Sequence, residues 1–102
     1  MILYAITLKN MSRDANGLPN YVWATESQIQ TLGKMRNNVE KRYEFVQIGN
    51  FIFSPMDISH IEKKDTEYYG GYIPKYVKDR YLLDQNQNKI GNLNNNMPLS
   101  LN

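Results

Sequence analysis

A Gly-Asn pair between two apolar runs constrains the fold more than any other feature of the chain. Gly49-Asn50 separates two runs of β-favouring residues, which is a signal for a two-residue β-hairpin turn. A loop of this length sets the register, so Ile48 opposes Phe51 and Val46 opposes Phe53. These four side chains share one apolar face, and the other face receives a mixed set, Phe45, Gln47, Ile52 and Ser54. We expect this hairpin to form the core.

The N-terminal segment predicts a buried strand. Residues Ile2 to Leu8 alternate between two faces, and both faces are largely apolar. That pattern is typical of a central strand that is covered on two sides. Residues 9–19 contain turn-forming residues and predict a loop, and residues 21–24 predict a short second strand.

Thr25 predicts the start of a helix. Its hydroxyl group can accept a hydrogen bond from the third backbone N–H of the helix, while the Gln28 side chain accepts one from the Thr25 backbone N–H. This arrangement is known as a capping box. Apolar residues then recur at helical spacing, at Ile29, Leu32 and Met35. This helix therefore has an apolar face that must dock on the rest of the protein, and we expect it to end at Asn37-Asn38.

The second half of the chain leaves alternatives open. Residues 54–57 fit the start of a helix or a single tight turn, and we favour the turn, followed by a strand over residues 58–63. Residues 68–73 fit a two-residue turn or a loop, and residues 75–83 fit a short helix or an irregular link. The polar run 84–88 predicts the turn of a final hairpin.

Together these elements predict one small α+β domain. We expect an antiparallel sheet of about five to seven strands with one main helix packed on a face. The length of 102 residues suffices for a single domain, which we place at residues 1–93. Residues 94–102 form an asparagine-rich segment that we expect to be a loosely ordered tail.

Composition excludes several functions. The absence of cysteine excludes a disulfide framework, a thiolate zinc site and a thiol nucleophile. The formal charge of +2, from 12 basic and 10 acidic residues, excludes an acidic nucleic-acid mimic and a strongly basic packaging protein. The sequence has neither a signal-peptide pattern nor a stretch of about 20 apolar residues, so we expect a soluble, cytoplasmic protein with no membrane partner.

No set of residues points to an enzyme, and we expect neither a cofactor nor a bound metal. His60 is the only histidine, and its neighbour Ser59 does not make a catalytic triad, which is defined by spatial geometry. The alternating run 84–88 imitates the first ligands of a calcium loop, yet Lys89 stands where that loop needs glycine.

The most unusual stretch is the tyrosine-rich segment, residues 68–81, where five of the eight tyrosines lie among three basic residues. Tyrosine combines a large apolar ring with a polar tip, which suits protein interfaces. Aromatic rings beside cations also suit stacked bases and phosphates. A third interpretation is that the rings cover one end of a thin core. The candidate partner-binding residues are Tyr68, Tyr69, Tyr72, Lys75, Tyr76, Lys78 and Arg80.

A second group of cations lies at the end of the predicted helix. It consists of Lys34, Arg36, Lys41 and Arg42, with Glu40 as the opposing acid. Cations at this position complement the negative end of the helix dipole, which is a sufficient explanation for them. Contact with phosphate groups is the alternative interpretation.

Four stretches of the chain resemble small accessory proteins of phages and mobile elements in Gram-positive bacteria. They are Tyr4-Ala5-Ile6-Thr7-Leu8, Thr25-Glu26-Ser27-Gln28, Phe45-Val46-Gln47-Ile48-Gly49-Asn50-Phe51-Ile52 and Asp57-Ile58-Ser59-His60-Ile61-Glu62. The resemblance spans residues 2–64, and its motifs are structural, so it assigns no residue a role. It implies an inhibitor of host defence, of which anti-CRISPR proteins are one kind.

We therefore expect a non-enzymatic protein that binds and inhibits a host protein by occupying its surface. The alternative is a small nucleic-acid-binding accessory or regulatory protein that uses the tyrosine-rich segment and the second group of cations. Salt separates the two functions, because phosphate contacts weaken steeply as the salt concentration rises. The sequence leaves the identity of the partner and the oligomeric state open, with a homodimer among the alternatives.

Overall fold

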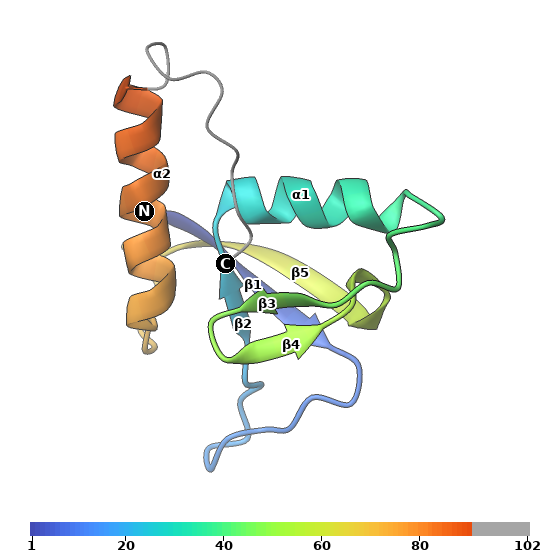
Figure 1. Ribbon diagram of the computed structural model, residues 1–102. Coiled ribbons are helices and arrows are strands. Elements are labelled where there is room, and N and C mark those ends of the chain that lie inside the picture. The colour runs from blue at the N-terminus through green and yellow to red at the C-terminus, as the bar shows by residue number, and fades with distance from the viewer. Residues whose placement is uncertain (91–102) are drawn as a thin grey trace.

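Figure 1 shows the computed structural model of the protein, which describes residues 1–90. Five strands, two α-helices and one turn of 3-10 helix follow one another along this part of the chain. They are β1 (Ile2–Leu8), β2 (Val22–Ala24), α1 (Glu26–Arg36), β3 (Val46–Ile48), β4 (Phe51–Phe53), η1 (Pro55–Asp57), β5 (Ile58–Asp65) and α2 (Lys75–Ile90). The predicted α+β class is confirmed.

A three-stranded antiparallel sheet in the order β2-β1-β5 forms the middle layer. Ile6 of β1 pairs with Val22 of β2 on one side and with Ile61 of β5 on the other. Because side chains alternate along a strand, Leu3 and Ala5 lie on the opposite face from Ile6, and all three are fully buried. The prediction of a central strand covered on two sides is confirmed.

The β3–β4 hairpin and α1 cover one face of this sheet. The hairpin has the predicted register, with Val46 opposite Phe53 and Ile48 opposite Phe51. Gly49 has a φ of +60°, which suits a hairpin turn with glycine at its first central position. A hydrophobic cluster joins these elements to the sheet: Ile6, Val22, Ala24, Leu32, Val46, Ile48, Phe53 and Ile58.

α1 begins as the sequence predicts. The Thr25 backbone N–H donates to Gln28 Oε1 at 2.9 Å, which completes the capping box. Leu32 is buried in the cluster between the sheet and the hairpin, and Ile29 and Met35 pack at its edge. The predicted apolar face is therefore the face that docks.

α2 and the segment before it cover the second face of the sheet. In Figure 1, α2 stands upright at one end of the strands, whereas α1 runs roughly horizontally above β5 and β3 in this view. The second cluster consists of Leu3, Ala5, Trp23, Ile73 and Val77. The ring of Tyr76 packs against both clusters. A Cβ added at Gly49 would lie only 2.8 Å from that ring, so the hairpin turn also packs on α2.

Two predictions about the sheet and the helices need correction. The prediction of five to seven strands in one sheet is not confirmed, because the described residues form one sheet of three strands and one of two. The predicted final hairpin is wrong, since residues 84–88 belong to α2. Helical spacing is the physical reason: Arg80 and Asp84 form an ion pair one turn apart, and Val77 docks the helix on the sheet. The helical alternative for residues 75–83 is therefore correct, and this helix continues through the residues predicted as a hairpin.

The remaining predictions concern shorter segments. Residues 55–57 form one turn of 3-10 helix with the capping box of the helical alternative, in which the Ser54 N–H donates to Asp57 Oδ2 at 2.9 Å. The helix ends after this turn, and β5 begins at Ile58 as the favoured alternative predicts. Residues 68–73 form a loop, one of the two predicted alternatives. The predicted tail, residues 94–102, lies outside the described residues. Neither helix of the described part has the length and apolar character needed to cross a membrane.

Candidate functional site

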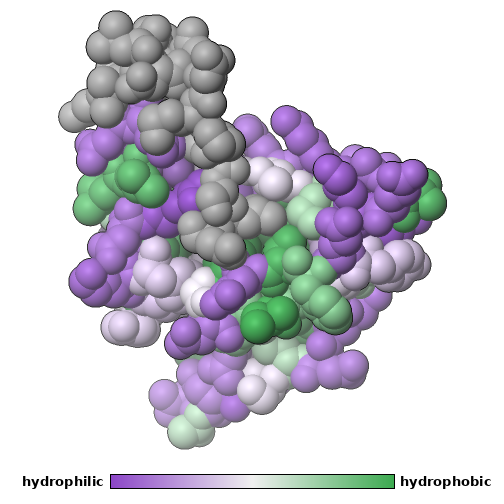
Figure 2. Space-filling view, viewed as in Figure 1, coloured by the Kyte–Doolittle hydropathy of each residue, from purple (hydrophilic) through white to green (hydrophobic). Residues whose placement is uncertain are grey.

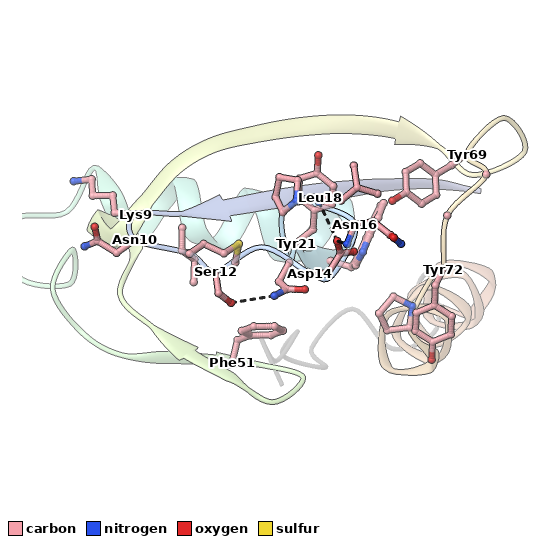
Figure 3. Close-up of a pocket in the computed structure, with 18 residues that line it drawn as sticks. Lys9, Asn10, Ser12, Asp14, Asn16, Leu18, Tyr21, Phe51, Tyr69 and Tyr72 are labelled. Carbon is pink, nitrogen blue, oxygen red and sulfur yellow. Dashed lines mark hydrogen bonds between the residues drawn. The ribbon is translucent and has the colours of Figure 1, made fainter.

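A groove of about 810 Å³ opens between the first loop and the tyrosine-rich segment. Twelve residues between Leu8 and Trp23 line it from one side, and five residues between Tyr69 and Pro74 line it from the other. Phe51 of β4 completes the lining, and Figure 3 shows these three segments around the same space. We call this feature the tyrosine groove. Its volume lies in the range of ligand-binding pockets, which is about 300–1,000 Å³.

The first wall of the tyrosine groove is a loop that holds its own shape. The Asp14 carboxylate accepts the backbone N–H groups of Asn16 and Leu18, each at 2.9 Å. The Arg13 guanidinium donates to the Gly17 carbonyl at 2.7 Å. These local bonds keep Leu18 on the rim, where 57% of its surface is exposed. The wall is therefore formed before any ligand arrives.

Aromatic rings form the base of the groove. Trp23 packs edge-on against Tyr21, with ring centres 5.8 Å apart, and against Tyr69, with ring centres 5.1 Å apart. Lys64 Nζ lies 5.9 Å from the centre of the Tyr69 ring. Tyr72 differs from these residues, because 80% of its surface is exposed. The groove thus combines packed rings at its base with a free ring on its rim.

The seven predicted partner-binding residues divide into two groups. Four of them face solvent: Tyr68, Tyr72, Lys75 and Lys78. Three are partly or fully buried: Tyr69, Tyr76 and Arg80. The tyrosine-rich segment therefore supplies part of the core as well as part of the surface.

Tyr76 connects elements within the fold. Its hydroxyl oxygen accepts the backbone N–H of Trp23 at 2.9 Å, which satisfies a buried donor on the edge strand β2. Burial raises the pKa of the Tyr76 hydroxyl above its usual value of 10.0. The hydroxyl group is therefore a neutral structural contact at physiological pH.

Arg80 also belongs to the fold. Its Nε lies 3.0 Å from Asp84 Oδ1, and only 8% of the arginine surface is exposed. Asp84 Oδ2 accepts the hydroxyl group of Ser27 at 2.6 Å, so this carboxylate links α2 to the first turn of α1. A second ion pair of α2, between Lys75 and Asp79 at 2.7 Å, lies on the surface, where the hydrogen bond from Lys75 to Asp79 raises the pKa of Lys75.

Sequence reasoning missed the first wall of the groove. Residues 9–19 predict a loop, and that prediction is correct, but turn-forming residues carry no signal for a binding surface. Leu18 and Phe51 become groove residues only because the fold brings them to the same groove as Tyr72, which lies in a distant part of the sequence. An apolar residue within a polar loop, such as Leu18, was the one available signal.

The second group of cations does not line the tyrosine groove. Lys34, Arg36 and Lys41 are exposed and Arg42 is half-buried, and Arg36 Nη1 makes a long contact of 3.5 Å with a backbone carbonyl. The ion pairs among the described side chains, those of residues 1–87, include none of these four residues. Two exposed aromatic residues follow these cations in the chain, Tyr43 and Phe45. Sequence reasoning did not assign either ring to a site.

His60, Glu62 and Lys64 lie in a row along one face of β5. Glu62 is 3.1 Å from His60 Nε2 and 2.6 Å from Lys64 Nζ. The hydrogen bond from Lys64 is the largest cause that lowers the pKa of Glu62, and the hydrogen bond with His60 is the second. Ser59 donates to the carbonyl of Thr7 at 3.1 Å and therefore serves the sheet. In the described part of the chain, no three acidic or histidine side chains are grouped as a metal would require.

Comparisons with known proteins do not assign this chain to a family. No family model, curated protein or solved structure matches it. The tyrosine groove and the second group of cations are therefore the features from which a function can be inferred.

Proposed function

We propose that the protein is a non-enzymatic binding protein that recognises another protein through the tyrosine groove. The observation that supports this proposal is a base of packed aromatic rings beneath exposed apolar side chains, Leu18 and Tyr72. Protein interfaces are enriched in tyrosine and tryptophan, because these rings bury a large area at a low entropic cost. A partner that covers the rim removes apolar surface from water, which favours association.

The partner that we propose is a host protein, and the proposed effect is inhibition. The resemblance of residues 2–64 to small accessory proteins of phages supports this choice. In its most specific form, the proposal is that the partner is a component of a host defence system of the CRISPR type. An inhibitor of this kind acts by occupying a surface, so it requires no catalytic residue.

Photo-crosslinking from the rim tests the proposal. A photoreactive phenylalanine analogue replaces Tyr72 in one variant and Leu82 in a control variant, because Leu82 is also exposed but does not line the groove. Each variant is irradiated in a lysate of a Gram-positive bacterium, with and without nuclease treatment. We expect a discrete protein adduct from position 72 alone. The adduct should form to the same extent when irradiation is carried out at high salt, because the contact is apolar.

A second substitution ties the adduct to the groove. Leu18→Ser changes an exposed side chain on the opposite wall, so it leaves the fold intact, and it should reduce the adduct from position 72 several-fold. Equal adducts from positions 72 and 82, or an adduct that nuclease removes, would contradict a protein-binding groove.

A further inference from the structure

A second surface of the protein carries a local excess of positive charge. Residues 34–45 contain four basic and two acidic residues, which gives this segment a formal charge of +2. The complete chain also has a formal charge of +2, from 12 basic and 10 acidic residues. A local excess of this kind attracts anions over a distance of about 8–10 Å at moderate salt.

The fold does not neutralise these cations. Among residues 1–87, whose side chains the structure describes, the ion pairs lie on β5 and α2, and they include neither the basic residues of the segment nor its acids, Glu40 and Glu44. The helix dipole explains Lys34 and Arg36, because both lie in the last turn of α1. It does not explain Lys41-Arg42, which follow the end of the helix, because the effect of the dipole fades beyond that turn.

Exposed aromatic rings lie beside the cations. Tyr43 is 68% exposed and Phe45 is 77% exposed. Phe45 lies two residues before Gln47, which pairs with the exposed Ile52, so these side chains share the outward face of the hairpin. Figure 2 shows this face, with an apolar patch over the hairpin and hydrophilic side chains over the end of α1.

A turn with its own hydrogen bonds connects the cations to the rings. The Asn38 carbonyl accepts the backbone N–H groups of Lys41 at 3.1 Å and Arg42 at 2.9 Å. The Asn38 side chain accepts the N–H of Glu40 at 2.9 Å, and the Lys41 carbonyl accepts the N–H of Glu44 at 3.0 Å. The spacing between charges and rings is thus set in advance, which lowers the entropic cost of binding.

We propose that residues 34–45, together with the outward face of the hairpin, bind single-stranded nucleic acid. Lys34, Lys41 and the two arginines provide the charge complementary to phosphates, and Tyr43 and Phe45 provide faces on which bases stack. A single strand fits better than a duplex, because its base faces are free to stack. It also fits better than an acidic peptide, whose carboxylates would use the cations but leave the rings unused. This surface shares no residue with the tyrosine groove, so it does not depend on the function proposed for the groove.

Fluorescence anisotropy with labelled oligothymidine and oligouridine of about 16 nucleotides tests the proposal. Binding should weaken as salt rises. Replacing Lys34 and Lys41 together by glutamine should reduce the slope of log affinity against log salt by about 1.4, because each lost phosphate contact contributes about 0.7 for a single strand. Tyr43→Ser and Phe45→Ser should each weaken binding about tenfold and leave that slope unchanged, because stacking involves no counterion release.

Matched variants of the tyrosine-rich segment provide the control. Tyr72→Ser and the combined Lys75→Gln and Lys78→Gln change exposed rings and cations elsewhere, and they should leave the affinity unchanged. Circular dichroism of each variant confirms that it is folded.

Three results would overturn the proposal. The first is no binding of either oligonucleotide at low salt. The second is equal affinity for a duplex of the same length. The third is equal affinity for labelled polyglutamate with no effect of the serine variants, which would indicate an acidic protein partner. Binding of either single strand that depends on both the rings and the lysines supports the proposal.

Discussion

The tyrosine-rich segment and residues 34–45 both place aromatic rings beside cations, yet the fold uses the two sets in opposite ways. In the first, Tyr76 accepts the backbone N–H of Trp23, and Arg80 pairs with Asp84 inside the structure. In the second, most of the cations and rings face solvent, and the ion pairs of the described residues do not include them. The same residue types therefore build core in one place and leave a free surface in the other.

The difference arises from what each segment has to cover. The tyrosine-rich segment crosses a face of the central sheet where Leu3, Ala5 and Trp23 need apolar neighbours. Residues 34–45 lie at the opposite end of α1 from α2 in Figure 1, where the hairpin already covers the sheet. A ring is drawn into the fold only where it removes apolar surface from water. Residue composition alone is therefore a poor guide to which aromatic residues are available to a partner.

The largest effect is expected from Asp84→Ala, which tests whether Arg80 is structural. The substitution takes a carboxylate away from the buried guanidinium and from the Ser27 hydroxyl group. Breaking a buried ion pair in this way should lower the free energy of unfolding by about 3 kcal/mol, measured by urea denaturation. The matched control is Asp79→Ala, one turn earlier on the same helix, which removes the surface pair with Lys75 and should not shift the urea midpoint. Equal shifts for the two variants would show that the buried pair does not anchor α2.

The next effect tests the contact between the hairpin and α2. Gly49→Ala places a side chain at a positive φ and within 2.8 Å of the Tyr76 ring, so we expect a loss of about 2 kcal/mol. Gly33→Ala is the control, because it lies within α1 with no atom near the added Cβ, and it should stabilise the protein by about 0.5–1 kcal/mol. Gly49→Ala should cost less free energy of unfolding in a Tyr76→Ala background than in the wild-type protein, because part of the loss depends on the ring. If Gly49→Ala costs the same free energy of unfolding with and without the Tyr76 ring, the close contact does not contribute to the loss.

Tyr76→Phe separates the hydroxyl group from the ring. The buried N–H of Trp23 loses its acceptor, which should cost about 1–2 kcal/mol. Tyr72→Phe is the control on the exposed side of the segment and should leave stability unchanged. The comparison fails if the Tyr72 variant is as unstable as the Tyr76 variant in urea.

A smaller effect is expected from pH. Burial raises the pKa of Tyr76 in the folded protein, so the unfolded chain loses this proton first as the pH rises. The free energy of folding that depends on a protonated Tyr76 hydroxyl is fully present below about pH 10, and it is lost as the pH rises through the folded pKa of this group. Urea midpoints measured across this range should therefore fall more steeply for the wild-type protein than for Tyr76→Phe. Parallel curves would indicate that the hydroxyl group is exposed.

The smallest effect on stability is expected from residues 34–45. Lys34→Gln with Lys41→Gln, and Tyr43→Ser or Phe45→Ser, change side chains that face solvent. Each variant should alter the free energy of unfolding by no more than about 0.5 kcal/mol. If Phe45→Ser lowers the free energy of unfolding by about 2 kcal/mol or more in thermal or urea unfolding, this ring packs within the fold.

Local patterns predicted a large part of the fold. The register of the hairpin, the capping box at Thr25 and the two-sided burial of Ile2–Leu8 each depend on residues that are close in sequence. Turn length, helix capping and side-chain alternation act over a few residues, so one sequence suffices to predict them. The candidate site was predicted in part, because Tyr72 belongs to the groove while Arg80 belongs to the core.

The sequence by itself thus determined the elements with strong local signals and the presence of two groups of aromatic residues and cations. Only the tertiary structure decided that residues 84–88 continue α2, that Leu18 and Tyr72 line the same groove, and which rings remain exposed. The physical reason is that these outcomes depend on burial and ion pairing between segments far apart in the chain. A side chain carries no local mark of which distant surface it will cover, because the free energy of burial depends on the neighbours that folding supplies.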